Sequence, residues 1–138
     1  RALDLGHHIM VFPQGTRSKR LIRGHTGMAQ MTQRLNLDIV PIGCMGSDKS
    51  YSGNLPWAKS GTIRYKVGEV MSLTGEQLAP YRIQEAFTPL GIDAQRQYGD
   101  RFRQITDIVM NEINSLLDPE YQFDPEATES VDNSKKFL

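Results

Sequence analysis

A short apolar run at residues 8–12 stops abruptly at Pro13 and Gly15, and this boundary constrains the fold more than any other feature of the sequence. An apolar stretch closed by a proline and a glycine is typical of a short buried strand that ends in a turn. A second apolar run, rich in β-branched residues, covers residues 39–44 and also predicts a strand. Pro41 lies inside it, which indicates an edge position or a local kink.

The residues between these two runs favour a helix. Met28, Met31 and Leu35 recur at spacings of three and four, which would place them on one helical face. A strand–helix–strand order with short connections favours a right-handed crossover between parallel strands. We therefore expect an α/β fold, with strands and helices alternating around a mixed sheet.

Two later segments extend this pattern. Residues 62–67 alternate polar and apolar side chains, as a half-exposed strand does. A long helix is expected over residues 93–117, where apolar residues step by three and four until Asp118 and Pro119 end the pattern. We expect this stripe to be a core helix face; its members are Phe102, Ile105, Val109, Ile113 and Leu116.

Composition sets the outer limits of the interpretation. A chain of 138 residues suits one domain, here assigned to residues 1–121, and residues 122–138 read as an acidic, disordered tail. The formal net charge is zero, so no overall charge attracts nucleic acid. Cys44 is the only cysteine, which excludes an intramolecular disulfide, and its apolar neighbours predict a buried thiol. The chain opens with Arg1 rather than methionine, which we interpret as a processed or truncated start.

The turn after residue 12 concentrates groups that bind anions. Glycine lets the backbone approach an anion closely, hydroxyl groups add donors, and an arginine fork matches two phosphate oxygens. The end of a buried strand is also where open α/β sheets place ligands. A solvated basic loop is the alternative reading, and the nucleotide-binding P-loop pattern is absent from the sequence. The candidate phosphate-binding residues are Gly15, Thr16, Arg17, Ser18 and Arg23, with possible contacts from Lys19, Arg20 and His25.

Residues 12–18, Phe-Pro-Gln-Gly-Thr-Arg-Ser, resemble the Phe-Pro-Glu-Gly-Thr-Arg-Ser block of the glycerolipid acyltransferases, typified by the 1-acylglycerol-3-phosphate (lysophosphatidate) acyltransferases. Four further segments are similar to later blocks of that family and follow in the same order. They are Leu-Ile-Arg-Gly at 21–24, Val-Pro-Ile at 40–42, Val-Gly-Glu-Val at 67–70 and Leu-Leu-Asp-Pro-Glu-Tyr at 116–121. Together they extend the resemblance over most of residues 8–121.

The resemblance implies acyl transfer in phospholipid synthesis. The hydroxyl of a lysophospholipid or glycerol phosphate would attack the thioester of acyl-CoA or acyl-carrier protein, with no metal and no further cofactor. By position, Gly15 and Arg17 would help to bind the phosphate of the acceptor. The implied fold is glycerol-3-phosphate acyltransferase-like and incomplete at the N-terminus. The implied location is the cytoplasmic face of a membrane, with no nucleic acid partner.

Two departures from the family pattern matter. Gln14 replaces the usual glutamate, so this possible substrate contact keeps its shape but loses its charge. The family also uses a His-x-x-x-x-Asp pair as its base, with the aspartate orienting the imidazole. No histidine of this chain has an aspartate five residues later, and we expect His7 and His8 to be surface residues. We therefore assign no catalytic residue, expect the pair upstream of Arg1, and expect the 138 residues alone to be inactive.

Two other functions stay open at this point. The chain would be a non-catalytic phospholipid or phosphate-binding module if it kept the acceptor site without a base. It would be a nucleic-acid-binding domain if the cations of residues 17–23 contacted a phosphate backbone. No aromatic residues are interleaved with these cations for base stacking, which disfavours the nucleic-acid reading.

Overall fold

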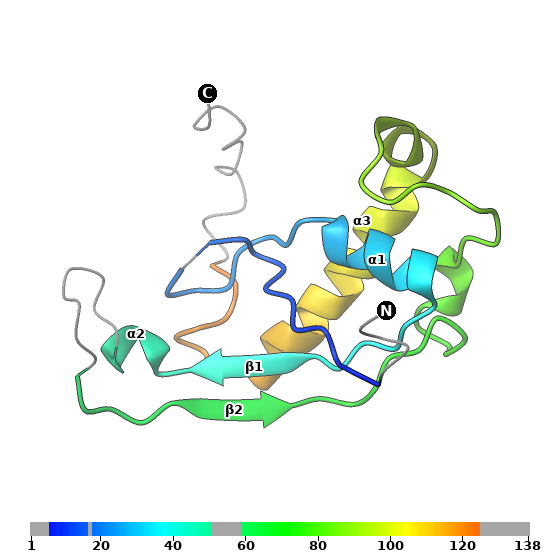
Figure 1. The fold of residues 1–138 in the computed structure, drawn as a ribbon. Helices are drawn as coiled ribbons and strands as arrows, with labels where there is room; N and C mark the ends of the chain where they lie inside the picture. The colour runs from blue at the N-terminus through cyan, green and yellow to red at the C-terminus, as the bar shows by residue number, and fades with distance from the viewer. Residues whose placement is uncertain (1–5, 17, 51–58, 125–138) are drawn as a thin grey trace.

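Helix α3, Ile92–Leu116, runs through the molecule and connects its two packed ends (Figure 1). The computed structural model describes residues 6–16, 18–50 and 59–124. The 25 residues of α3 give it a length of about 37 Å. Helix α1, Gly27–Leu35, and the short 3₁₀ helix η2, Ala79–Tyr81, pack on α3, and strand β1, Ile42–Met45, also contacts it.

The larger core forms on the predicted apolar stripe of α3. Phe102, Ile105 and Val109 are buried there, as expected, while Ile113 and Leu116 are only half-buried. The Phe102 ring lies 5.4 Å from the Phe87 ring, centroid to centroid, in a tilted arrangement. The side chains that cover the stripe come from α1 and from the connection after β2: Met28, Ala29, Met71, Leu73, Leu78 and Ile83.

Helix α1 confirms the predicted helix but not its predicted buried face. Leu35 is 46% exposed, whereas Gln30 and Gln33 are buried. The reason is that both glutamines hold main-chain groups of the connection that crosses α1. The Gln33 carboxamide donates to the Tyr81 carbonyl at 2.9 Å and accepts from the Ile83 N–H at 3.0 Å. Burial therefore follows the hydrogen-bonding needs of the connection as well as apolar spacing.

The sheet has two antiparallel strands, β1 and β2, Arg64–Val67. With helices α1, α2 (Ser47–Ser50) and α3, it makes a small mixed α/β fold over the described residues. Gly43 and Met45 are buried and the alternate residues of β1 are exposed. Cys44 is one of these exposed residues, so the predicted buried thiol is wrong: the strand turns it to the face opposite α3.

Residues 8–12, predicted to be a buried strand, belong to no strand in the described part of the chain. Met10 and Phe12 are each 77% exposed. A strand is stable when its backbone pairs with a neighbour, and the structure describes no strand that pairs with this run. The predicted parallel crossover is consequently not formed; β1 pairs with the strand that follows it instead.

A smaller core closes the C-terminal end of α3. It contains Leu21, Met45, Met110, Leu117 and Tyr121. The Phe123 N–H donates to the Asn114 side chain at 2.8 Å, so hydrogen bonding to α3 extends to residue 123. The rest of the predicted tail, residues 125–138, lies outside the described residues.

Candidate functional site

The predicted glycine turn is present. The Gly15 N–H donates to the Phe12 carbonyl at 3.1 Å, which closes a tight turn around Pro13 and Gln14. Gly15 has a φ of 66°, in the left-handed region that glycine adopts without strain. The sequence pattern therefore located the turn correctly, although the segment before it is not a strand.

His25 packs directly against this turn. The main-chain N–H of His25 donates to the Pro13 carbonyl at 2.7 Å. A Cβ added at Gly15 would lie 3.2 Å from Cδ2 of the His25 ring. Glycine is thus favoured here by its backbone conformation, and a Cβ would also press on the imidazole beside it. The contact brings the turn next to the start of α1, which begins two residues after His25.

The loop after the turn is held at two points. The Ser18 hydroxyl donates to the Arg20 carbonyl at 2.6 Å. The Leu21 N–H donates to the Tyr121 carbonyl at 2.8 Å, which ties the loop to the end of the described chain. Ser18 is therefore engaged within the loop, while the Thr16 side chain is exposed to solvent.

The predicted cations do not share one environment. Lys19 is exposed and Arg20 is half-buried. Arg23 turns toward α3, where its Nη2 lies 3.9 Å from an Asp107 carboxylate oxygen. Arg17 lies outside the described residues, so its role stays a prediction. The Gln14 amide nitrogen is shielded from solvent and has no hydrogen-bond partner among the residues that the structure describes.

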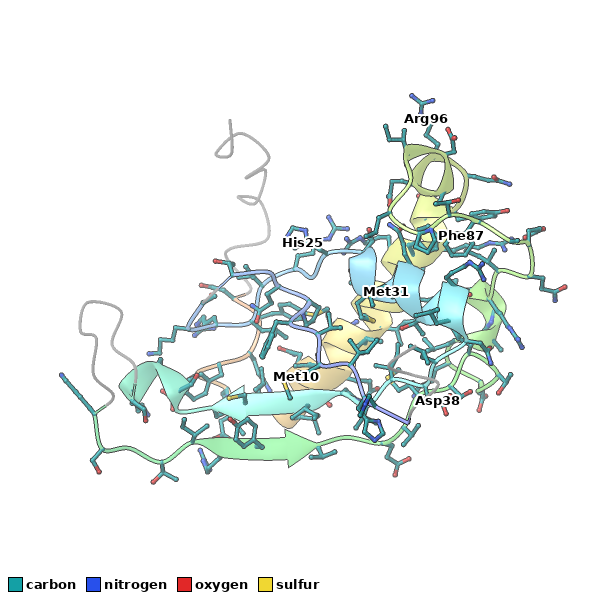
Figure 2. The ribbon with its side chains drawn as sticks, in the orientation of Figure 1. Met10, His25, Met31, Asp38, Phe87 and Arg96 are labelled. Atoms are coloured by element: carbon teal, nitrogen blue, oxygen red, sulfur yellow. The ribbon has the colours of Figure 1, made fainter. Side chains whose placement is uncertain are left out.

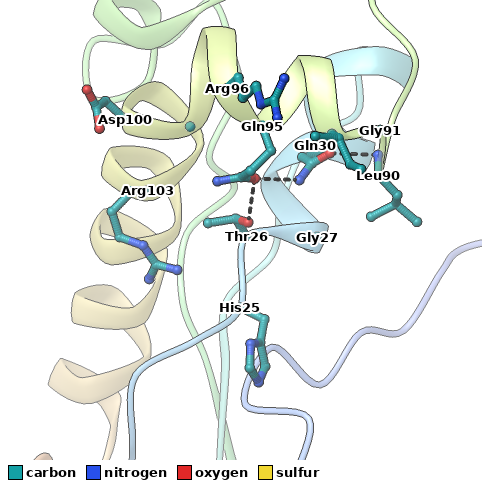
Figure 3. Close-up of a pocket in the computed structure, with 12 residues that line it drawn as sticks. His25, Thr26, Gly27, Gln30, Leu90, Gly91, Gln95, Arg96, Asp100 and Arg103 are labelled. Carbon is teal, nitrogen blue, oxygen red and sulfur yellow. Dashed lines mark hydrogen bonds between the residues drawn. The ribbon is translucent and has the colours of Figure 1, made fainter. Parts of the chain in front are cut away.

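An open groove of about 880 Å³ adjoins the turn at His25 (Figure 3). It lies between the start of α1 and the N-terminal half of α3. Gln95 lines it and joins its two sides, because its carboxamide oxygen accepts from the Gln30 Nε2 at 3.1 Å and from the Thr26 hydroxyl at 3.4 Å. The Gln30 oxygen in turn accepts from the Leu90 N–H at 2.7 Å.

Two arginines of α3 line this groove. Arg103 is anchored, since its Nη1 donates to the Gly24 carbonyl at 2.8 Å and to Asp107 at 3.0 Å. Arg96 extends outward near the beginning of α3 (Figure 2). Sequence analysis missed both residues. Their separation by seven positions places them on one helical face, but nothing in the sequence indicates that α1 begins opposite that face.

The histidines near the start of the described chain lie at the surface. His7 and His8 are exposed, as expected of surface residues. Across residues 6–16, 18–50 and 59–124, no helix is both long and apolar enough to cross a membrane. The same ranges contain no cluster of three or more histidine, cysteine or acidic residues suited to a metal ion.

Comparison of the chain with protein-family models, with curated proteins and with solved structures finds no match in any of the three. Function therefore has to be argued from the turn, from the groove and from the sequence segments themselves.

Proposed function

We propose that this chain is the C-terminal portion of a glycerolipid acyltransferase domain and that it holds the acceptor-phosphate subsite. In the proposed reaction, the hydroxyl of a lysophosphatidate-like acceptor attacks the thioester carbonyl of acyl-CoA or acyl-carrier protein. The ester forms, the C–S bond breaks and the thiol leaves with the proton that a base has taken from the hydroxyl. The base, a histidine oriented by an aspartate, belongs to sequence before Arg1 in this proposal.

One observation supports the proposal most: the segments that carry the resemblance meet in pairs. The Leu21 N–H donates to the Tyr121 carbonyl at 2.8 Å, which joins the second segment to the fifth. The Gly68 N–H donates to the Pro41 carbonyl at 2.9 Å, which joins the third to the fourth. Four of the five segments therefore meet in two pairs within one folded unit, as the proposal requires of blocks that belong to a single domain.

The chemistry of the turn also fits a phosphorylated lipid headgroup. The exposed Lys19 and Thr16 supply a charge and a hydroxyl donor, and Arg17 is proposed to supply a two-pronged contact. The highly exposed Met10 and Phe12 lie just before the turn. Apolar side chains beside cations are the combination found where proteins contact the boundary between headgroups and acyl chains. We therefore propose action at the cytoplasmic face of a membrane, with acyl donor and phosphorylated acceptor as the partners.

A titration of the 138-residue chain with sn-glycerol 3-phosphate, followed by ¹H–¹⁵N NMR, tests the acceptor subsite. We expect a saturable shift of the Gly15 amide. Arg17→Ala should weaken the apparent affinity about tenfold, the effect of losing one charge-assisted contact. Arg34→Ala, at an exposed position in the last turn of α1, is the matched control and should leave the affinity unchanged. An unshifted Gly15 amide, or equal weakening by both variants, would contradict the proposal.

A further inference from the structure

The groove between α1 and α3 is lined by two arginines of α3, Arg96 and Arg103, of which only Arg103 is ion-paired among the described residues. Arg96 is exposed and forms no ion pair among the described residues. The Arg103 side chain is 24% exposed, and its Nη1 makes both the ion pair to Asp107 and the hydrogen bond to the Gly24 carbonyl. The remaining guanidinium N–H groups of Arg103 face no acceptor in the described part of the chain. The groove is therefore bordered by one guanidinium that is unpaired within the described ranges, that of Arg96, and by one paired guanidinium, that of Arg103, which keeps further N–H donors.

The acid that lies between these arginines in the helix does not neutralise them. Asp100 follows Arg96 by four residues, a spacing at which a helical ion pair is possible. No such pair forms with Arg96 or with Arg103 in the described structure. In Figure 3 the Asp100 carboxylate points away from both guanidinium groups. Because Asp100 also lines the groove, anion binding there would depend on the N–H donors of the two arginines rather than on a net positive charge.

A neutral donor lies between the two cations. The oxygen of Gln95 is occupied by Thr26 and Gln30, which fixes the orientation of its carboxamide. Its Nε2 lies over Gly99, so close that a Cβ added there would be 2.9 Å away. A Cβ at position 99 would therefore require this amide group to shift. Gly99 thus leaves room for the Gln95 Nε2, a donor that makes no hydrogen bond to the described protein atoms.

We infer that this groove binds phosphate esters at a site separate from the Gly15 turn, with Arg96, Arg103 and the Gln95 amide as the donors. The two arginines are separated by about 10.5 Å along the helix axis, so one small anion would not readily span them at full contact. A diphosphate or a phosphate ester with an extended polar part fits better. Leu90 and Ile92, 72% and 73% exposed at the rim, can cover an apolar portion of the same ligand. This inference does not depend on acyl transfer.

The test is a ¹H–¹⁵N NMR titration of the 138-residue chain with three separate probes: coenzyme A, sn-glycerol 3-phosphate and inorganic phosphate. The reporters are the amides of Gly27, Gly91 and Gly99, all of which line the groove. We expect a phosphate ester to shift them saturably and more tightly than inorganic phosphate. Tighter binding of coenzyme A would identify a donor-type ligand; tighter binding of glycerol 3-phosphate would identify an acceptor-type ligand.

Arg96→Gln should weaken that binding about fivefold, as expected for one solvent-exposed guanidinium–phosphate contact. Arg101→Gln is the matched control. It removes the same charge from the same helix, but Arg101 donates to the Arg82 carbonyl outside the groove. Its affinity should equal that of the unmodified chain. Equal weakening by the two variants would overturn the inference, as would inorganic phosphate binding as tightly as the esters or an absence of saturable shifts.

The reporters separate this inference from the proposed function. Shifts confined to Gly15 would support the acceptor subsite at the turn and overturn the groove site. Shifts confined to Gly27, Gly91 and Gly99 would support the groove site and contradict the subsite at the turn.

Discussion

Phe102 and Phe12 show how differently two regions of this chain use the same side chain. Phe102 is completely buried among the rings and aliphatic groups on α3, whereas Phe12 is 77% exposed. Both belong to apolar patterns that predict burial from sequence. The difference lies in what covers them: α1 and the connection after β2 pack on α3, but no described strand pairs with residues 8–12. An apolar pattern therefore predicts burial only where the folded chain supplies the covering surface.

Truncating each phenylalanine in turn tests most directly whether the two regions differ in burial. Phe102→Ala should lower the free energy of unfolding by about 3–5 kcal/mol, because it removes a fully buried ring and leaves a cavity. Phe12→Ala, the matched control, should change it by less than about 0.5 kcal/mol, as is usual for exposed positions. Urea denaturation followed by circular dichroism measures both. A loss of several kcal/mol on truncating Phe12 would mean that residues 8–12 are covered after all.

The buried Gln33 amide provides a similar test within the well-packed region around α3. Gln33→Ala should cost about 1–3 kcal/mol, because the Tyr81 carbonyl and the Ile83 N–H would lose their partner in a buried setting. Gln84→Ala, at an exposed position of the same connection, should be close to neutral. Urea titrations of the two variants measure the change in the free energy of unfolding that each causes. Similar small effects would show that apolar packing alone holds the connection on α1.

Local features of this fold were predictable from the sequence, whereas contacts between distant segments were not. The α3 stripe, α1 and the glycine turn were predictable because each depends on local spacing or on a glycine conformation. The exposure of Leu35 and the burial of Gln33 were not, since they depend on a connection that returns to α1 from residues distant in sequence. The groove was missed for the same reason: Arg96 and Arg103 acquire a common space only when α1 begins opposite α3.

The β1–β2 sheet differs from both the large α3 core and residues 8–12, because ion pairs attach strand β2 to the end of α3. All four residues of β2 are exposed, and Asp118, just beyond α3, accepts hydrogen bonds from Lys66 at 3.1 Å and from Arg64. The hydrogen bond from Lys66, with the nearby Arg64 charge, holds the pKa of Asp118 below its usual value, although partial burial opposes this. A carboxylate with a lowered pKa stabilises the folded state above its unfolded pKa of about 4 and loses this contribution as the pH falls through its folded pKa.

The smallest effect we predict is therefore confined to acid. Asp118→Asn should lower the urea midpoint slightly at pH 7 and should flatten its decline below about pH 4, since the variant has no carboxylate to protonate there. Asp38→Asn, at an exposed position with no ion pair among the described residues, controls for the change in net charge and should keep the acid decline of the unmodified chain. If both variants showed the same acid profile, Asp118 would not attach β2 to α3, and the sheet end would depend on the small apolar core alone.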